Sequence, residues 1–338
     1  MKRELWKKIG MSALRISAAL AIIFGIPALC YLIWQPGSDR PFPEFKENAI
    51  WLGHGWLGDD GWFERNQRSK EKFRSEEKIE ALFKKLAENK ISIVYPHLCP
   101  AQFDGRIAPY DSNQLERFLT LAEKYHIRVI PWVGGILYES ARPDDRKWVK
   151  NFFASVEELF KNHPRVTGIH LNIEPMPDGN REFCDFLAEL RKVVGERILS
   201  VAAYPPPTKW HQYPNVHWGI SYFAELSKHC DQMAVMMYDT AIPLEKFYIN
   251  LMTDWTQSLA SITQKNSTKL ILGVPAYDDH GVGYHYPHVE NMLSALRGIS
   301  AAGRNCNIDG IAIYCNWEWM KTSGRSGGNS SNKSRLIS

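Results

Sequence analysis

"VTGIHLNIEP", residues 166–175, alternates apolar and polar side chains until a glutamate and a proline end the pattern. This alternation predicts a β-strand, because successive side chains of a strand point to opposite faces of the sheet. Ile169, Leu171 and Ile173 lie on one face of the predicted strand, and the other face carries His170, Asn172 and Glu174. Burying a histidine, an amide and an acid is costly unless each has a partner. The stretch therefore predicts a strand that delivers polar groups to a functional site.

The rest of the chain repeats this unit of a short strand followed by a helix. Seven other apolar or β-branched runs lie at residues 49–54, 91–98, 127–135, 198–204, 232–239, 269–277 and 308–317. Apolar residues at helical spacing lie between them, at 76–88, 113–125, 145–162, 181–194 and 289–302. Eight strands that alternate with helices predict an α/β fold of the (β/α)8 TIM barrel type, which needs about 250 residues. The alternative, a doubly wound open sheet, is disfavoured because no G-x-G-x-x-G opens the first helix.

Composition places the chain among globular proteins with one large folded domain. It has 338 residues, 44% of them hydrophobic and 12% aromatic, and a net charge of +4. No basic stripe or reader motif is present, so we expect no nucleic-acid partner. The six cysteines lie at 30, 99, 184, 230, 306 and 315. They form no CxxC pair, so we expect free thiols and no zinc site.

The N-terminus predicts a membrane anchor. Lys2, Arg3, Lys7 and Lys8 precede an uncharged run at 16–34. Nineteen apolar residues nearly cross a hydrocarbon core, and the basic flank predicts a cytoplasmic N-terminus with the remainder exported. A secreted form, made by signal cleavage, is the alternative, but the run lacks a clear A-x-A cleavage site.

These features divide the chain into four parts. Residues 1–35 form the basic end and the transmembrane signal anchor, and 36–47 form a linker rich in Pro and Gly. Residues 48–320 form the barrel, and the Gly/Ser/Asn-rich residues 321–338 form a disordered tail. We expect a monomer.

The predicted strand ends are rich in aromatic residues and poor in charge. In a barrel, catalytic residues lie at the C-terminal ends of the strands. Those ends carry His54, His97, Trp132, Glu174, Tyr204, Tyr238, Asp239, Tyr277, Asp278, Asn316 and Trp317. Aromatic faces that stack on sugar rings would suit this composition, and so would aromatic side chains that simply fill the barrel mouth.

The stretch quoted first also resembles a known active-site motif. "TGIHLNIE" resembles the D-G-x-D-x-D-x-E signature of glycoside hydrolase family 18, the chitinase family, with the glutamate at Glu174. Thr167, His170 and Asn172 stand where that signature has aspartates. The N-x-E arrangement is similar to the endo-β-N-acetylglucosaminidases of glycoside hydrolase family 85. The resemblance therefore implies a divergent family 18 barrel.

Three later strands carry further resemblances in the family's order. "QMAVMMYD", residues 232–239, resembles the sixth-strand M-x-Y-D motif. "LILGVPAY", residues 270–277, resembles the seventh-strand L-G-x-P-x-Y. "DGIAIY", residues 309–314, resembles the eighth-strand G-x-x-x-W segment, with Tyr314 in place of the tryptophan.

The resemblance implies a substrate-assisted retaining mechanism, with no cofactor and no metal. In such glycosidases the 2-acetamido oxygen of the sugar attacks the anomeric carbon, in place of a second carboxylate. By resemblance, Glu174 protonates the leaving oxygen, Asn172 orients the acetamide nitrogen, and Tyr238 donates its hydroxyl to the acetamide oxygen. Asp239 contacts the same sugar, and His170 lies deeper and supports Asn172 by a hydrogen bond. The other expected sugar-binding residues are Met236, Trp132, Tyr204, Tyr277, Tyr314 and Trp317.

Asn172 changes the electrostatics of the predicted acid. An aspartate at that position would raise the pKa of Glu174 by like-charge repulsion, and a neutral amide does not. Burial must then keep Glu174 protonated near neutral pH. We therefore expect slow hydrolysis, or a preference for transfer of the sugar to another acceptor. The sequence does not choose among chitin, peptidoglycan, poly-N-acetylglucosamine and an N-glycan core.

A retaining glycosidase with two carboxylates is a first alternative. Asp278, Asp279 and Glu318 are its candidate second acids. The seventh strand, however, ends without a glutamate.

Metal-assisted hydrolysis is a second alternative, suggested by the polar segment at 278–288. It gathers Asp278, Asp279, His280, His285 and His288. A solvated polar loop explains the segment equally well, and the first strand has only His54 where metal-dependent barrels often show H-x-H.

A glycan-binding protein without activity is a third alternative. The replaced acidic positions fit it, whereas the retained Glu174 argues against it.

Overall fold

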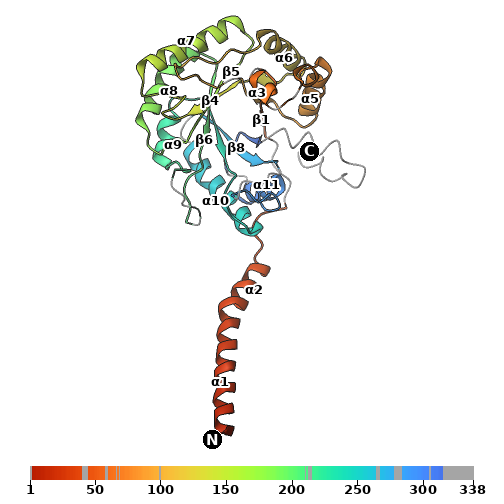
Figure 1. Cartoon of the computed structure of the whole chain (residues 1–338), viewed down its shortest axis with the longest axis vertical. Coiled ribbons are helices and arrows are strands. Elements are labelled where there is room, and N and C mark those ends of the chain that lie inside the picture. The colour runs from red at the N-terminus through yellow and green to blue at the C-terminus, as the bar shows by residue number, and fades with distance from the viewer. Residues whose placement is uncertain are drawn as a thin grey trace.

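The structure is a computed structural model, and the description covers residues 2–39, 45–57, 60–65, 67, 69–98, 100–209, 211, 215–263, 267–277, 284–303 and 306–314. The predicted site residue Trp317 lies outside these residues, as do Asp278, Asp279, His280, Asn316, Glu318 and the predicted tail. Figure 1 shows an apolar N-terminal helix that leads into a barrel of strands ringed by helices.

In the described part of the chain, nine strand segments form one parallel sheet in the order β3-β2-β1-β9-β8-β7-β6-β5-β4. Their bounds are β1 Ala49–Leu52, β2 Ile93–Pro96, β3 Arg128–Val129, β4 Trp132–Ile136, β5 Gly168–Glu174, β6 Ile198–Ala203, β7 Gln232–Met236, β8 Lys269–Pro275 and β9 Gly310–Tyr314. Every pair of neighbours is parallel, for example Trp132 beside His170 and Gly134 beside Asn172. The prediction of a TIM-like α/β barrel is confirmed.

β3 and β4 are two halves of one strand position in the barrel. The predicted single strand at 127–135 is interrupted at Pro131, which has no N–H to donate to a ladder. Backbone hydrogen bonds still join both halves to β2 and to the residues just after it. Ile130 N donates to Val94 O at 3.0 Å, and Leu98 N donates to Trp132 O at 3.0 Å. The barrel therefore closes with eight strand positions, as predicted.

The helices cover the outside of the sheet (Figure 1). Their bounds are α3 Asp60–Arg65, α4 Lys70–Phe73, α5 Glu76–Glu88, α6 Ser112–Lys124, α7 Arg146–Asn162, α8 Arg181–Val194, α9 Ile220–Leu226, α10 Glu245–Thr263 and α11 Met292–Ala301. The five predicted helices are present within a few residues of their expected ends. Asp111, Asp145 and Asn180 cap the starts of α6, α7 and α8 with their side-chain oxygens.

Two hydrophobic cores fill the domain, one on each side of the sheet. The outer core packs the strands against the helices and includes Ile169 and Leu171 of β5, both almost fully buried. The inner core fills the barrel and includes Trp51, Tyr95 and Ile130. The two faces predicted for "VTGIHLNIEP" are therefore the helix-facing and the barrel-facing sides of β5.

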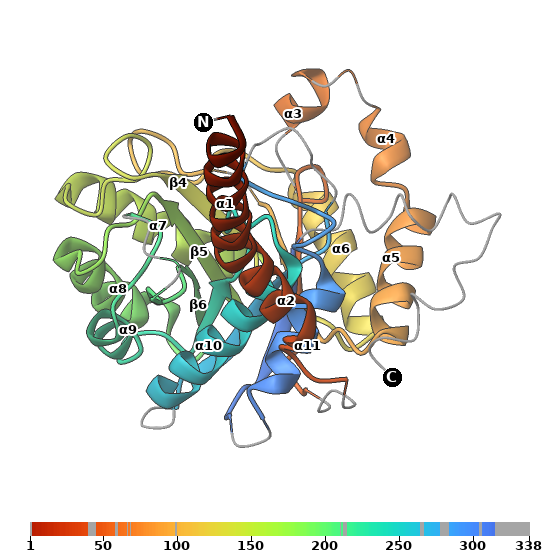
Figure 2. The ribbon, with the colours of Figure 1, turned by 90° about the horizontal axis from the view of Figure 1, so that it is seen from below.

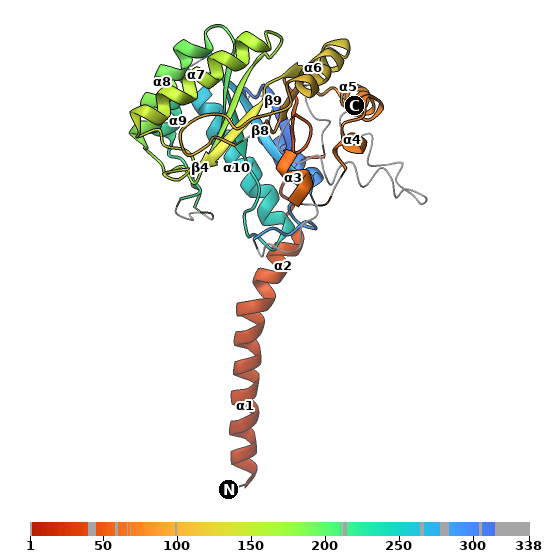
Figure 3. The same ribbon diagram turned by 45° about the horizontal axis from the view of Figure 1, so that its top comes forward.

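The N-terminal helix runs as α1 Lys2–Leu20, a π-helical segment Ala21–Gly25 and α2 Ile26–Ile33. Its portion Gly10–Ile33 is long and apolar enough to cross a membrane, and none of it is buried in the protein. Figure 3 shows the helix projecting from the barrel on the side of α10.

Candidate active site

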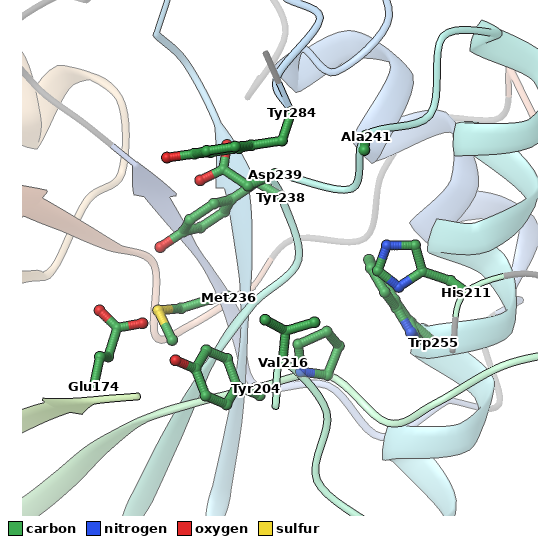
Figure 4. A pocket seen from close by; sticks show the side chains of 11 residues that line it. Glu174, Tyr204, His211, Val216, Met236, Tyr238, Asp239, Ala241, Trp255 and Tyr284 are labelled. Carbon is green, nitrogen blue, oxygen red and sulfur yellow. The ribbon is translucent and has the colours of Figure 1, made fainter. Parts of the chain in front are cut away.

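Parallel strands bring the C-terminal ends of β5, β6 and β7 to one rim of the barrel. Glu174 is the last residue of β5, Tyr204 follows β6 directly, and Tyr238 and Asp239 follow β7 by two and three residues. All four line a cavity of about 470 Å³, a size common for ligand sites. Figure 4 shows Glu174 at one end of the cavity, with the hydroxyls of Tyr204 and Tyr238 on its side.

Glu174 has the environment that a proton donor needs. Burial raises the pKa of its carboxyl, and the nearby Asp239 charge raises that pKa further. Hydrogen bonds from Tyr204 and from Asn172 favour the ionised form and lower the pKa in part. The net pKa is raised above the ordinary value of a glutamate, so the neutral acid persists to a higher pH.

Asn172 lies one alternate position before Glu174 on the same face of β5. Its Nδ2 donates to Glu174 Oε2 at 3.1 Å. Its Oδ1 is buried and accepts no hydrogen bond from the described residues. Gly134 allows β4 to pass close by, since a Cβ there would lie 2.6 Å from Asn172 O. Asn172 therefore orients the carboxyl of Glu174 through its Nδ2, and its Oδ1 is available to accept a hydrogen bond from a ligand.

His170 is fully buried inside the barrel, below the cavity. Its Nε2 accepts from Trp51 Nε1 at 3.0 Å, and its Nδ1 lies 2.8 Å from Ser200 Oγ. Ser200 Oγ donates to Gln232 Oε1 at 2.9 Å. Tyr95 stacks on the imidazole with ring centroids 4.2 Å apart. Burial lowers the pKa of His170 to about 3, so the ring is neutral.

The expected hydrogen bond from His170 to Asn172 was wrong. Both ring nitrogens of His170 are used by Trp51 and Ser200, so His170 belongs to a satisfied polar layer in the barrel. Its predicted role as a sugar-binding residue is not supported by its position, because its side chain has no exposed surface.

Among the described residues, Tyr238 is held in place by ring stacking. Its ring lies parallel to that of Tyr314, with centroids 4.6 Å apart and an interplanar angle of 4°. Tyr277 and Trp51 meet the same ring edge to face. Burial raises the pKa of the Tyr238 hydroxyl well above its ordinary value, so the hydroxyl stays a donor. Tyr314 packs one face of its ring against Tyr238 and so helps to hold the Tyr238 ring in place.

Asp239 is fixed by groups from the next strand and loop. The Tyr277 hydroxyl donates to Asp239 Oδ1, and His285 Nδ1 lies 3.2 Å from the same oxygen. Asp239 itself has a positive φ of 58°, an uncommon backbone conformation that turns the chain at this point. The carboxylate is therefore oriented before any ligand arrives.

His285 lies between two carboxylates behind the cavity. Its Nδ1 lies 3.6 Å from Glu290 Oε2 as well as close to Asp239, and its side chain is fully buried. Burial lowers the pKa of His285, but the nearby carboxylates of Asp239 and Glu290 outweigh this and raise it to about 9. Thr240 satisfies Glu290 through its N–H and its hydroxyl. The protonated ring thus supplies the positive charge between the two acids.

Asp239, His285 and Glu290 are also the described residues whose oxygen and nitrogen atoms could hold a metal ion, since these atoms lie within 4.8 Å of one another. The segment at 278–288 was the candidate for metal-assisted hydrolysis, and its His285 belongs to this group. Residues 278–280 of that segment lie outside the described part of the chain. The other predicted second acids, Asp278, Asp279 and Glu318, lie outside it too.

The structure therefore gathers only part of the predicted site around the cavity. Glu174, Met236, Tyr238, Asp239 and Tyr204 line it, whereas Asn172, Tyr277 and Tyr314 contact those residues from behind. Trp132 opens β4 in register with His170, in the layer below. Sequence reasoning missed Pro205, His211, Val216, Ala241, Trp255 and Tyr284.

The missed residues come from loops and from α10, where no strand pattern marks them. His211 and Trp255 form the end of the cavity opposite Glu174 (Figure 4). Burial, and next the nearby His217, lower the pKa of His211 to about 4. The wall opposite the acid is therefore aromatic and uncharged.

A parallel barrel with a half-buried acid at the end of β5, tyrosine hydroxyls beside it and an aromatic cavity is typical of glycoside hydrolases of the barrel type. The model of the glycosyl hydrolases family 18 matches residues 73–284, which include β2 to β8 and the acid. The chain belongs to this family, and the predicted resemblance to it is confirmed.

Solved structures agree on the fold. The C-terminal domain of a putative chitinase from Desulfitobacterium hafniense DCB-2 is 11% identical, with a TM-score of 0.55, covering 80% of this chain and 94% of that one. A chitinase from Chromobacterium violaceum is 13% identical, with a TM-score of 0.53, covering 84% and 100%. The Bacillus megaterium spore cortex-lytic enzyme SleL is 11% identical, with a TM-score of 0.53, covering 84% and 75%. Comparison with curated proteins gave no match.

Proposed function

We propose that the protein is a retaining glycoside hydrolase that cleaves glycans containing N-acetylglucosamine by substrate assistance. The observation that carries this proposal is the environment of Glu174, a half-buried acid of raised pKa that lines the cavity at the mouth of the barrel. The putative chitinase and the chitinase among the structural neighbours favour the same class of sugar.

The chemistry requires one proton donor and a rigid hold on the acetamide. The acetamide oxygen of the sugar attacks the anomeric carbon, and Glu174 gives its proton to the leaving glycosidic oxygen. A bicyclic oxazoline forms in its protonated, oxazolinium state, because Asn172 is a neutral amide and cannot remove the acetamide proton. A water molecule then attacks the anomeric carbon and opens the ring, while the Glu174 carboxylate takes up the proton from that water. The configuration at the anomeric carbon is retained after these two inversions.

Two neighbours of Glu174 are assigned to the acetamide. Asn172 Oδ1 is a buried acceptor without a partner among the described residues, and it would accept the acetamide N–H. The Tyr238 hydroxyl would donate to the acetamide oxygen as that oxygen becomes the nucleophile. Fixed donors of this kind orient the attack and stabilise the charge that develops. Asp239, held by Tyr277 and His285, would bind a hydroxyl of the same sugar.

The location of the protein is part of the proposal. Residues 1–35 serve as a signal anchor, so the barrel is exported and stays attached as a monomer to the membrane. The end of the apolar helix contacts the barrel through Lys246 and Phe247, which favours a retained anchor over a cleaved signal peptide. Residues 36–47 then link it to the barrel at 48–320, and 321–338 form a tail.

A glycan-binding protein with little or no activity is the second candidate. The replacement of three family aspartates by Thr167, His170 and Asn172 favours it.

The test is a screen of N-acetylglucosamine oligomers, together with a thiazoline analogue of the oxazoline. Release of shorter oligomers, with inhibition by the thiazoline far tighter than by the product sugar, is the result expected for substrate assistance. Binding of the oligomers without release of any product would overturn the hydrolase in favour of the binding protein. Cleavage that the thiazoline leaves unaffected would overturn the mechanism.

A further inference from the structure

The end of the apolar helix is fastened to the barrel at the start of α10. Lys246 Nζ donates to the backbone oxygens of Tyr31, Leu32 and Trp34, at 2.8, 2.9 and 2.6 Å. The last carbonyls of a helix lack partners within the helix, so this lysine caps them. The ring of Phe247 lies 5.8 Å from that of Tyr31 and 5.4 Å from that of Trp34.

The segment after the helix continues along the barrel instead of hanging free. Gly37 lies against α10, since a Cβ on it would be 2.8 Å from Ile249 Cγ2. Ser38 N donates to Arg297 O in α11 at 3.1 Å, and Arg297 Nε lies 3.2 Å from Asp39 Oδ1. The helix therefore meets the barrel in one defined place, between α10 and α11.

This place is close to the cavity. α10 follows β7, so its first turn lies at the rim of the barrel that carries Glu174. Ala241 lines the cavity, and Phe247 contacts the anchor six residues later. A chain of six residues spans at most about 22 Å. Figures 1 and 2 show the helix leaving the barrel beside α10 and α11.

Exposed apolar side chains gather at the same corner. Leu244, Phe247 and Leu293, which we term the apolar corner, are 44%, 40% and 46% exposed. Ser294 Oγ donates to Glu245 Oε1 at 2.9 Å, which joins the starts of α10 and α11. The corner is continuous with the end of the apolar helix, where Trp34 and Tyr31 are of the types enriched at membrane interfaces.

We infer that the apolar corner rests on the surface of the bilayer and thereby holds the mouth of the cavity next to the membrane. The substrate would then be a glycan attached to a lipid of the same membrane, presented within reach of the cavity. The membrane contact follows from the anchor and the corner, and the choice of glycan rests on the proposed function.

The membrane contact is tested by photocross-linking of the full chain in phosphatidylcholine–phosphatidylglycerol vesicles. Benzoylphenylalanine replaces Leu293 in one sample and Glu158 in a matched control. Glu158 is exposed on α7, which lies on the far side of the barrel from α2 (Figure 1). Lipid capture at position 293 well above capture at 158 is expected. Equal capture at the two positions would overturn the inference.

The substrate is tested with an N-acetylglucosamine tetramer, either free or coupled to phosphatidylethanolamine in the same vesicles. One variant combines Lys246→Ala and Phe247→Ala with about 20 Gly and Ser residues inserted after Gln35, a flexible span of about 25 Å. We expect unchanged cleavage of the free tetramer and about tenfold slower cleavage of the tethered one, through loss of effective concentration. An equal effect on both substrates would contradict the inference. If the wild-type protein cleaves neither, the proposed function fails, while the cross-linking result still decides the membrane contact.

Discussion

Asn172 Nδ2 donates a hydrogen bond to Glu174 Oε2 at 3.1 Å, between two residues on the same face of β5. The bond stabilises the ionised form of Glu174, while burial and Asp239 stabilise the neutral acid. The pKa of the proton donor is therefore set by a balance in which Asn172 opposes burial. In the family signature an aspartate at this position would act in the opposite direction.

Asn172→Asp should move the pH dependence of catalysis. The added negative charge and the loss of the N–H donor both favour protonated Glu174, so its pKa rises further. Because the acid must be protonated to act, we expect the alkaline limb of kcat to move up by about one pH unit. Rates with a fluorogenic N-acetylglucosamine oligomer measure the shift. Asn162→Asp, at the exposed end of α7, is the matched control. An alkaline limb that stays in place or moves down would contradict the balance described for Glu174.

Tyr238→Phe should impair the chemical step and leave the fold intact. The ring keeps its stacking on Tyr314, while the hydroxyl assigned to the acetamide oxygen is lost. Removing one such donor costs about 100-fold in kcat. Steady-state kinetics should show this loss in kcat more than in KM. Tyr125→Phe, at the end of α6 and away from the cavity, should match the wild type. If the Tyr238 variant retains full kcat, the hydroxyl has no role in the reaction.

His170→Ala should destabilise the barrel. The change removes the acceptor of Trp51 Nε1 and one of the hydrogen-bond partners of Ser200 Oγ, which keeps Gln232, and it opens a cavity under Tyr95. We expect a loss of about 3 kcal/mol in the free energy of unfolding, measured by urea titration of the full chain in detergent. Glu158→Ala on the exposed face of α7 should change it little. A loss as small as that of the control would mean that the polar layer is not structural.

His285 should make stability depend on pH on the alkaline side. Its folded pKa is raised from 6.5 to about 9 by its contacts with Asp239 and Glu290, against the opposing effect of burial. The stabilisation is therefore complete below pH 6.5 and is lost as pH rises through 9, and it amounts to about 3 kcal/mol. The difference in Tm between the wild type and His285→Gln should shrink across this range. Tyr277 stacks on the His285 ring and is present in both proteins, so any effect of its own titration on Tm is common to the two. A difference in Tm that is constant from pH 6 to pH 10 would exclude a protonated His285.

The barrel and its acid were predictable because strand alternation and strand ends are local features of the sequence. The alternation from Ile169 to Glu174 marked both faces of β5, and the order of the strands placed Tyr238 and Asp239 at the same rim. The interruption of the third strand at Pro131 follows from the absent N–H of proline, yet the hydrophobic run alone concealed it.

What the sequence did not predict depends on contacts between distant residues. The partners of His170 are Ser200, thirty positions away, and Trp51, on the first strand, so its role could not be read from β5 alone. The contact of Lys246 with the end of the apolar helix joins residues more than 200 positions apart. Neither relation leaves a periodic signal in the chain.

Glu174→Gln gives the most direct measurement, with hydrolysis of N-acetylglucosamine oligomers as the readout and Glu158→Gln as the matched control. The glutamine keeps the shape of the side chain but has no acidic proton, so we expect the rate to fall by about a thousandfold while the control matches the wild type. A Glu174→Gln variant that releases product at the wild-type rate would show that another group donates the proton.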